Sequence, residues 1–482
     1  MENGRWFMVY GIYKCHSELD SGSSSGLRNV NQKLKRVQLD SAGEIKKKLI
    51  VVLFGFFLFN ANINAQSVDS LVNEAIVNNP KLKSLQYRIE ASKYRSESVD
   101  YLPPPNLSVE FSQVPISQID IFNQSISNNF GLSQMFPLGG KPSAMADVEN
   151  KNTLVEGNNF DAYKINLTAQ VKLSYFNLWL IDRKIEIQRS NISLLSDFAK
   201  AIEVSFYTNR ISQADLLSVQ SEIASNEAQI FIFDKQRESL VYNLNKLLGR
   251  DLNSKDVFVL KDFEIDSLQL SQLQLEELLA DSNPTLNKMN NMIEMNKAMI
   301  TANNKELIPD LMVQGMLMRM PRGMILTSAS DLTMLDPKTE WMYSLMFSIN
   351  LPFAPWSVGK INHKEEELAA GINSIEQEKN DMEREMTAQL KEALVKYKTA
   401  KELEGLYDNK VIPLYTSSSE SQTTAYQNGK TNISTVIDSY RMLLMQKMNY
   451  YMSKADIQMS LAEVEMMVGA NLRNLKLSEG NY

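Results

Sequence analysis

The side chains with the clearest capacity for chemistry are methionines, and they are concentrated in one part of the chain. Of the 25 methionines, 12 fall between residues 289 and 346. Six of them share one face of two alternating segments: Met312, Met316, Met318, Met320, Met342 and Met346. Thioethers are soft ligands that suit Cu(I) or Ag(I), but methionine also fills gaps as an adaptable apolar residue. A site for soft metal ions and simple packing therefore both remain open.

Residues for covalent or acid–base catalysis are scarce. The chain has one cysteine, Cys15, and two histidines, His16 and His363. A disulfide framework, a cysteine zinc site and a Ser/His/Asp or Cys/His catalytic pair are therefore poorly supported. The stretch "GGKPS" at 139–143 lacks the spacing of a phosphate-binding loop. We predict that the protein is not an enzyme and needs no cofactor.

The methionine face belongs to segments that alternate as β-strands do. In "EWMYSLMFSINL" (340–351) every odd-numbered residue is apolar, and segments near 106–112, 129–136 and 311–320 alternate in the same way. Four amphipathic strands of roughly ten residues match transmembrane strands in length and pattern. Because four strands cannot close a barrel and an open sheet edge cannot be satisfied in hydrocarbon, other copies of the chain must complete the sheet.

The elements that would position these strands are helical and occur in two tandem copies. "NNPKL" at 78–82 returns as "SNPTL" at 282–286, and "LLGRDL" returns as "MVGANL". In each copy, apolar residues of a long helix recur at coiled-coil spacing, and a shorter helix returns beside it. The helices are expected at about 68–101, 141–206 and 212–248 in the first copy and at about 273–305, 358–425 and 432–468 in the second.

The start of the chain has the features of an export signal. Three lysines at 46–48 precede eleven apolar residues and a small residue, Ala65, that suits cleavage. Residues 1–45 are read either as an over-long gene start or as an extended leader. Without residues 1–65, 41 Lys and Arg stand against 52 Asp and Glu, an acidic balance that argues against binding nucleic acid. The expected organisation is leader and signal peptide at 1–65, first repeat at 66–270, second repeat at 271–470 and tail at 471–482.

These motifs, in order and twice over, resemble the TolC-like outer-membrane efflux proteins across about 68–470. The resemblance rests on "AIVNNPKL" and "LLADSNPTL", "YLPPPNLSVEF" and "ELIPDLMV", "LSQMFPLGGK" and "SINLPF", and the closing "LLG" and "MVG". It implies a mainly α fold with a β-barrel portion: a trimeric tube whose twelve strands cross the outer membrane and whose helices form a periplasmic tunnel. The family's partners are a periplasmic adaptor protein and an inner-membrane transporter. "FPLGGK" with "PNLSVEF" looks most like the heavy-metal cation branch.

The turns between the long and the returning helices resemble the family's periplasmic tips, where the adaptor binds and the tunnel narrows. The residues that this implies as adaptor contacts are Asn209, Arg210, Ile211, Ser212, Leu217, Gly429, Lys430, Thr431, Thr435 and Val436. Ser212 and Thr431 or Asn432 would also serve as helix N-caps. The candidate gate residues are Asp438 and Asp215. A ring of Asp438 side chains would favour cations, whereas the alternative is a solvated helix residue.

The sequence thus predicts an exported outer-membrane channel subunit that conducts its cargo passively, with metal cations as the expected cargo. A multidrug or type I protein-export channel of the same family is the alternative. A periplasmic coiled-coil scaffold, in which the helices cover one face of a small soluble sheet, is the alternative from a different class.

Overall fold

A computed structural model provides the structure of the protein. It describes residues 66–117, 119–207, 212–254, 257, 259–265, 267–321 and 338–472. These residues belong to one compact unit, Ala65–Tyr482. The predicted leader at 1–65 and three of the predicted adaptor contacts, Asn209, Arg210 and Ile211, lie outside the described residues.

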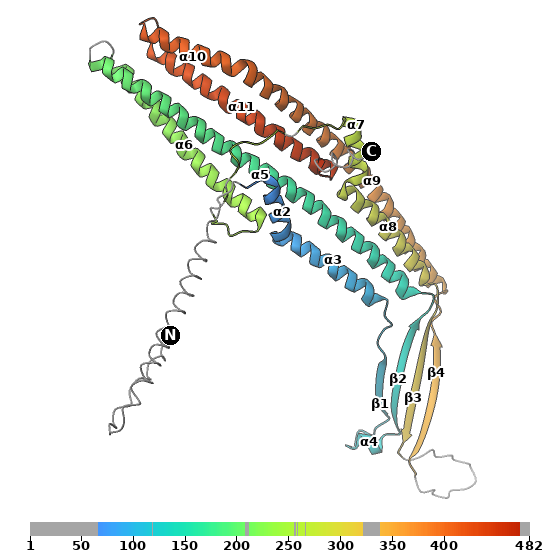
Figure 1. Cartoon of the computed structure of the whole chain (residues 1–482). Coiled ribbons are helices and arrows are strands. Elements are labelled where there is room, and N and C mark those ends of the chain that lie inside the picture. The colour runs from blue at the N-terminus through green and yellow to red at the C-terminus, as the bar shows by residue number, and fades with distance from the viewer. Residues whose placement is uncertain are drawn as a thin grey trace, which may run out of the picture. The chain divides into compact units, whose positions relative to one another are not determined.

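The helices follow the predicted tandem repeat (Figure 1). The first copy contains α2 (Val68–Asn78), α3 (Pro80–Val99), α5 (Lys141–Tyr207) and α6 (Gln213–Leu248). The second contains α7 (Gln272–Ser282), α8 (Pro284–Lys305), α9 (Pro355–Leu406), α10 (Ile412–Gln427) and α11 (Ile433–Val468). None of the helices in the described ranges combines the length and the apolar character needed to span a membrane.

Each copy begins with an Asn–Pro elbow that divides the predicted first helix in two. Asn79 caps α3 by accepting hydrogen bonds from two backbone N–H groups, and Pro80 supplies a first residue that needs no N–H partner. The Asn79 amide also donates to the carbonyl of Leu247 at 2.9 Å. In the second copy Asn283 caps α8 and donates to the carbonyl of Met467 at 2.7 Å. Each elbow is therefore tied to the end of the returning helix of its own copy.

The returning helices end on glycines because the elbows come so close. Gly249 and Gly469 have φ values of +71° and +80°, which glycine adopts without strain. A Cβ on Gly249 would lie 2.7 Å from the carbonyl oxygen of Asn78. A Cβ on Gly469 would lie 3.0 Å from both Asn283 Cα and Pro284 Cδ. In each copy, the "NP" motif thus contacts the "LLG" or "MVG" motif that ends the returning helix.

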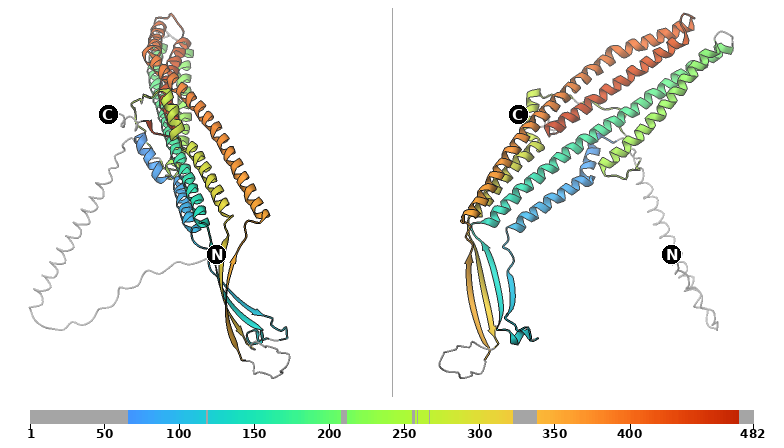
Figure 2. Two further views of the ribbon diagram at one scale, coloured as in Figure 1. Left: turned by 90° about the vertical axis from the view of Figure 1, so that its right-hand side faces the viewer. Right: turned by 180° about the vertical axis from the view of Figure 1, so that it is seen from behind.

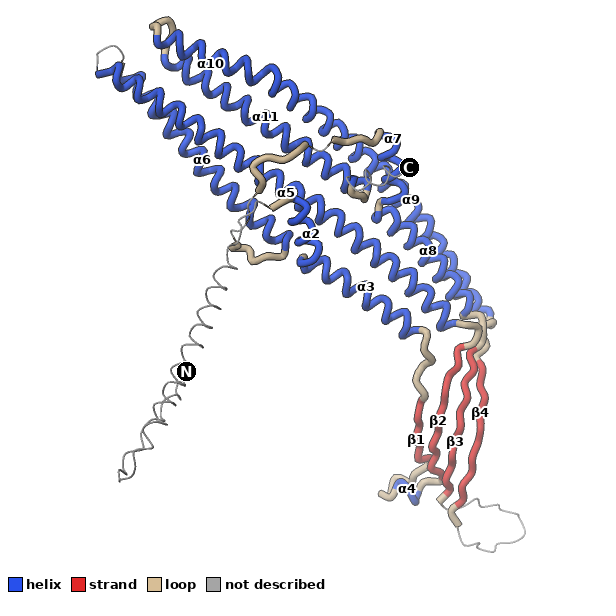
Figure 3. Tube along the Cα trace, viewed as in Figure 1, coloured by secondary structure: helices blue, strands red, loops and turns tan. Residues whose placement is uncertain are grey.

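The strands form one antiparallel sheet in the order β1-β2-β3-β4. They are β1 (Asn106–Ser112), β2 (Ser127–Pro137), β3 (Asp310–Met320) and β4 (Glu340–Ile349). They lie side by side beyond one end of the helices, as Figure 2 shows from two further sides, and the hairpin tips lie at the opposite end (Figure 3). Register pairs Leu317 with Phe130 on one side and with Tyr343 on the other. Because side chains alternate along strands, these residues share one apolar face.

Three contacts join the two copies along the helices and at the start of the sheet. The ammonium of Lys172 on α5 forms a buried ion pair with Glu465 on α11. Lys141, at the start of α5, lies 2.8 Å from Asp310 at the start of β3. Trp179 on α5 packs against Tyr451 of α11 and against Phe263 of the linker between the copies. The two copies, each with its own main core, are therefore joined along α5 and α11 and at the start of the sheet.

The long helix of the second copy also departs from the sequence prediction. The helix expected over 358–425 is interrupted by a π-helical turn, η1 (Tyr407–Val411), between α9 and α10. Pro413 lies in the first turn of α10. A proline lacks an N–H and its ring collides with the carbonyl four residues earlier in a regular α-helix. A wider turn just before Pro413 relieves that collision.

The elbow contact predicts a specific loss of stability for Gly469→Ala. The variant needs a strained left-handed alanine and displaces Pro284, so we expect the free energy of unfolding to fall by about 1–3 kcal/mol. The matched control is Gly405→Ala, because Gly405 lies in α9 with open space around it and should be unchanged or gain up to about 1 kcal/mol. The measurement is denaturant unfolding followed by helical circular dichroism, and equal stability of the two variants would contradict the elbow contact.

Candidate functional site

The tips of the two helical hairpins pack on each other through a small apolar core. This tip core comprises Leu195, Ile202, Val219, Ile433, Val436 and Ile437. Val436 is fully buried there, so its side chain packs between the hairpins in this state, and its role as an adaptor contact stays a prediction. The tip core joins α5 and α6 of the first copy to α11 of the second.

The remaining described tip residues lie at the surface. Ser212, Leu217, Gly429 and Lys430 are exposed, and Thr431 and Thr435 are partly exposed. Their surface is therefore open to a partner, as the adaptor prediction requires.

Two of the tip residues predicted as N-caps have that role. Ser212 accepts a hydrogen bond from the backbone of Asp215, and Asn432 accepts one from the backbone of Thr435 at 2.9 Å. These caps fix where the returning helices begin. Helix α11 is capped by Asn432, so of the two alternatives, Thr431 and Asn432, the second is correct.

Asp215 links the two hairpins directly. The hydroxyl of Tyr426 on α10 donates to the carboxylate of Asp215 on α6 at 3.1 Å. Burial, reinforced by the nearby negative charge of Asp215, raises the pKa of Tyr426 to about 12. The phenol therefore keeps its proton and remains a donor throughout the physiological pH range.

Asp438 is exposed but not alone. Arg441 donates to Asp438 at 3.2 Å on the same helix and to Glu222 on α6 at 2.6 Å. The Glu222 side chain is only 8% exposed, whereas that of Arg441 is 57% exposed. Arg441 thus neutralises a buried carboxylate across the hairpin interface and an exposed one beside it. The two predictions for Asp438, a ring of charge that favours cations or a solvated helix residue, did not include Arg441 as a partner.

Three residues that link the hairpins, Tyr426, Arg441 and Glu222, were not among the predicted site residues. The signal for Glu222 is its spacing, since Val219, Glu222 and Asn226 fall on one face of α6 and all three are buried. The side chain of Asn226 donates to the carbonyl of Glu222 at 2.7 Å and accepts from Gln188 on α5. A carboxylate at a core position predicts a cationic partner on a facing helix, although the sequence does not say which one.

The sheet register places the six methionines on one face. Met318 pairs with Met342, and Met316 lies between Gly131 and Ser344. Met346 pairs with Gln314, so amide and hydroxyl groups are interspersed with the thioethers. Within the described residues no group of three or more His, Cys, Asp and Glu could hold a metal ion. The role of the six methionines as soft ligands stays a prediction.

Known proteins resemble the chain in part of its sequence and in its fold. Residues 71–250 match the family model described as outer membrane efflux protein. No curated protein matches the chain in sequence. Several solved structures are similar over most of their length, and at 17% identity or less these similarities establish the fold alone.

Three of these structures are channel proteins. CusC, solved in a study of folding and transmembrane channel formation, is 17% identical, with a TM-score of 0.66 over 85% of this chain and 93% of that one. The open-state MtrE outer membrane channel of Neisseria gonorrhoeae is 15% identical, with a TM-score of 0.66 over 84% and 89%. The CmeC outer membrane channel of Campylobacter jejuni is 15% identical, with a TM-score of 0.64 over 87% and 90%. The chain has the TolC-like fold.

Arg441→Ala tests the polar connection between the hairpins. The variant leaves the Glu222 carboxylate buried without a cation, so we expect the free energy of unfolding to fall by about 1–3 kcal/mol. Lys235→Ala is the control, since its pair with Glu238 on α6 is exposed on both sides and should be worth less than about 1 kcal/mol. Denaturant unfolding measures both losses, and adding Glu222→Gln should restore part of the first. Equal losses in the two single variants would show that the Arg441–Glu222 pair does not hold the hairpins.

Proposed function

We propose that the chain is one subunit of a homotrimeric outer-membrane channel in a tripartite efflux system, with its sheet in the membrane and its helices in the periplasm. The channel catalyses no reaction and conducts its cargo passively to the outside. The observation that carries the proposal is the sheet, whose outer strands β1 and β4 are both unpaired edges within the chain. The match of residues 71–250 to the efflux family and the TolC-like fold support the same conclusion.

The faces of the sheet favour a membrane over a soluble scaffold. Nearly every residue of β4 is exposed, including Tyr343 at 83%, Phe347 at 68% and Leu345 at 66%. In a scaffold the helices would cover one side of the sheet, but they lie beyond its end (Figure 3). Lipid on the apolar face and two further copies at the edges would satisfy both the exposed side chains and the unpaired backbone groups.

The tip surface is the proposed docking site for the periplasmic adaptor. It comprises the described residues Ser212, Leu217, Gly429, Lys430, Thr431 and Thr435, together with Asn209, Arg210 and Ile211 outside the described residues. Contacts there bear directly on the links between the hairpins, because Asp215 and Asp438 lie within the first two turns of the same helices. We propose that the adaptor opens the channel by separating Tyr426 from Asp215 and Arg441 from Glu222, with Asp438 freed to face cations.

Metal cations are the proposed cargo. The methionine face is the specific support, because in a closed sheet with its apolar face toward lipid the thioethers point inward. The acidic balance of the chain also favours cations over anions as cargo. A multidrug channel or a type I protein-export channel of the same architecture is the alternative, and the inner-membrane transporter would decide between them.

Two neighbouring variants on opposite faces of β4, Leu345→Arg and Ser344→Arg, test whether the apolar face lies in the membrane. A cationic side chain facing lipid near the middle of a strand costs about 2–4 kcal/mol, so Leu345→Arg should lose most of its heat-modifiable trimer in detergent-extracted outer membranes. Ser344→Arg, which points to the other face, should keep it. Gel mobility with and without heating distinguishes the two variants. If the parent protein itself were a monomer that stays in solution without detergent, the channel proposal would be contradicted.

A fourfold variant tests the thioethers in transport. Met312, Met316, Met342 and Met346 changed together to leucine keep volume and apolar character but remove the soft ligands. In a strain lacking the native protein, we expect the variant to restore copper or silver tolerance less than the parent does. The same change at Met289, Met292, Met295 and Met299 of α8 is the control. Full tolerance with the sheet variant would assign those methionines to packing.

A further inference from the structure

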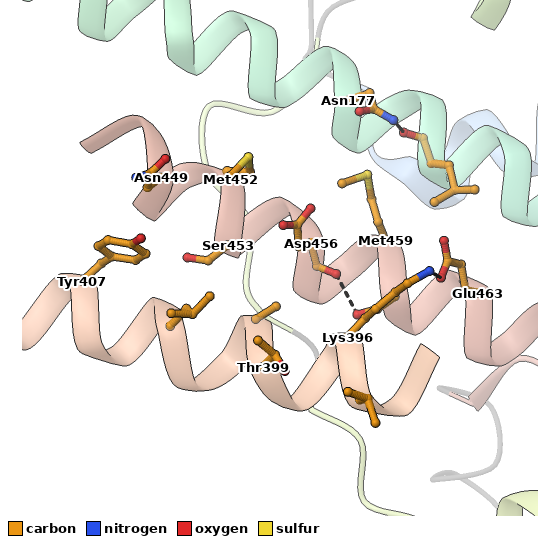
Figure 4. Close-up of a pocket in the computed structure, with 15 residues that line it drawn as sticks. Asn177, Lys396, Thr399, Tyr407, Asn449, Met452, Ser453, Asp456, Met459 and Glu463 are labelled. Atoms are coloured by element: carbon orange, nitrogen blue, oxygen red, sulfur yellow. Dashed lines mark hydrogen bonds and ion pairs between the residues drawn. The ribbon is translucent and has the colours of Figure 1, made fainter. Parts of the chain in front are cut away.

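The helical region holds a cavity of about 580 Å³ between α5, α9 and α11, at the level of the π-helical turn (Figure 4). Its volume falls in the range that accommodates organic ligands, about 300–1,000 Å³. The walls are mainly apolar and include Leu173, Val395, Leu403 and Met452. The ring of Tyr407, the first residue of η1, lines one end.

One carboxylate in this cavity has no hydrogen-bond or ion-pair partner within the described residues. Asp456 lies on α11 and is half-buried, and no hydrogen bond or ion pair from the described part of the chain reaches its side-chain oxygens. In Figure 4 the side chains of Met452, Asp456 and Met459 stand in a row along α11, as expected for residues one and two turns apart on one helix face. An unpaired carboxylate among apolar side chains attracts a cation that can also be buried.

The other charged side chains of the lining, Lys396 and Glu463, form an ion pair with each other. Lys396 on α9 lies 3.5 Å from Glu463 on α11 and 3.1 Å from Glu392 on its own helix. The ammonium is thus occupied by two carboxylates at the rim. Asp456 therefore supplies the charge that remains available to a ligand.

Asp456 and the linker between the two copies lie on different faces of α11. The linker packs in one cluster with Tyr451 through Phe263 and in another with Ile457 through Leu268. These positions on α11 are about 100° or more around the helix from Asp456. Figure 4 shows the linker passing behind α11. The linker therefore leaves the Asp456 side chain uncovered.

We propose that this cavity binds a drug-sized organic cation, with its positive charge on the Asp456 carboxylate and its apolar body against Leu173, Val395 and Leu403. Size decides against a metal ion as the occupant, because one carboxylate in 580 Å³ leaves most of the volume empty around an ion. The π face of Tyr407 would add a cation–π contact. Binding of this kind needs neither membrane nor transport, so it can fail or succeed independently of the channel proposal.

Ethidium, a planar fluorescent organic cation, is a suitable probe for the detergent-solubilised full chain. Asp456→Asn should weaken ethidium binding roughly tenfold or more, and Thr399→Trp should abolish it, because Thr399 is an exposed wall residue whose enlargement fills the cavity without disturbing the core. Asp262→Asn is the control, since it removes an exposed negative charge on the linker side of α11 and should leave binding unchanged.

Acidification provides a second test. Burial raises the pKa of Asp456, with Glu463 adding to the effect and Lys184 on α5 opposing it. Binding should therefore be full above the pKa of this carboxyl and weaken as the pH falls through it, and the dependence should disappear in Asp456→Asn.

The comparison ligands are the anionic dye 1-anilinonaphthalene-8-sulfonate and Ag⁺. Weaker binding of the anion than of ethidium, together with loss of ethidium in both cavity variants, would support the site. Ethidium binding that survives Asp456→Asn and Thr399→Trp would overturn it. Binding of Ag⁺ that depends on Asp456 while ethidium does not bind would also overturn it, in favour of a metal site.

Discussion

The constraint on which the structure depends is that every backbone N–H and C=O in a sheet needs a partner. Within the described residues, β2 and β3 each pair with a strand on both sides, and the outer sides of β1 and β4 are open. One face is apolar and exposed, so water does not suit it, and lipid does not suit the open edges. In the proposed channel, an assembly of copies that closes the sheet would meet both demands. The long helices, which carry the sheet at one end and the joined hairpins at the other, would then surround the same axis.

The helical region is held differently at the elbows and at the tips. Each elbow fastens one copy internally, through an asparagine cap that also bonds the returning helix and a glycine that lets the two backbones meet. At the tips the two copies meet each other through a small apolar core and a few polar pairs, of which Arg441–Glu222 and Tyr426–Asp215 cross between hairpins. Separation of the hairpins would therefore break the tip contacts and leave both elbow contacts intact.

Much of the fold could be predicted because it is written in local patterns. The strand alternation predicted the faces of the sheet. The repeated Asn–Pro and Gly motifs revealed the two copies but not the elbows, because the first helix of each copy was expected to be continuous. The links between hairpins could not be predicted, because the pairing of Arg441 with Glu222 depends on which faces of two distant helices meet. Val436 shows the same limit, since an apolar residue beside a turn can belong to a docking surface or to a core. The cavity around Asp456 was missed because its residues come from three helices and share no motif.

The π-helical turn at Tyr407–Val411 sets the rotational phase of the second hairpin. Ala400 before it and Ser419 after it are both buried, yet their numbers differ by one more than a whole number of α-helical turns of 3.6 residues. The wider turn absorbs that extra residue, as a one-residue insertion would require. A chain shortened by one residue here could continue as a regular α-helix and still present the same stripe to α11, so this turn is a place where the hairpin can change in length without changing its packed face.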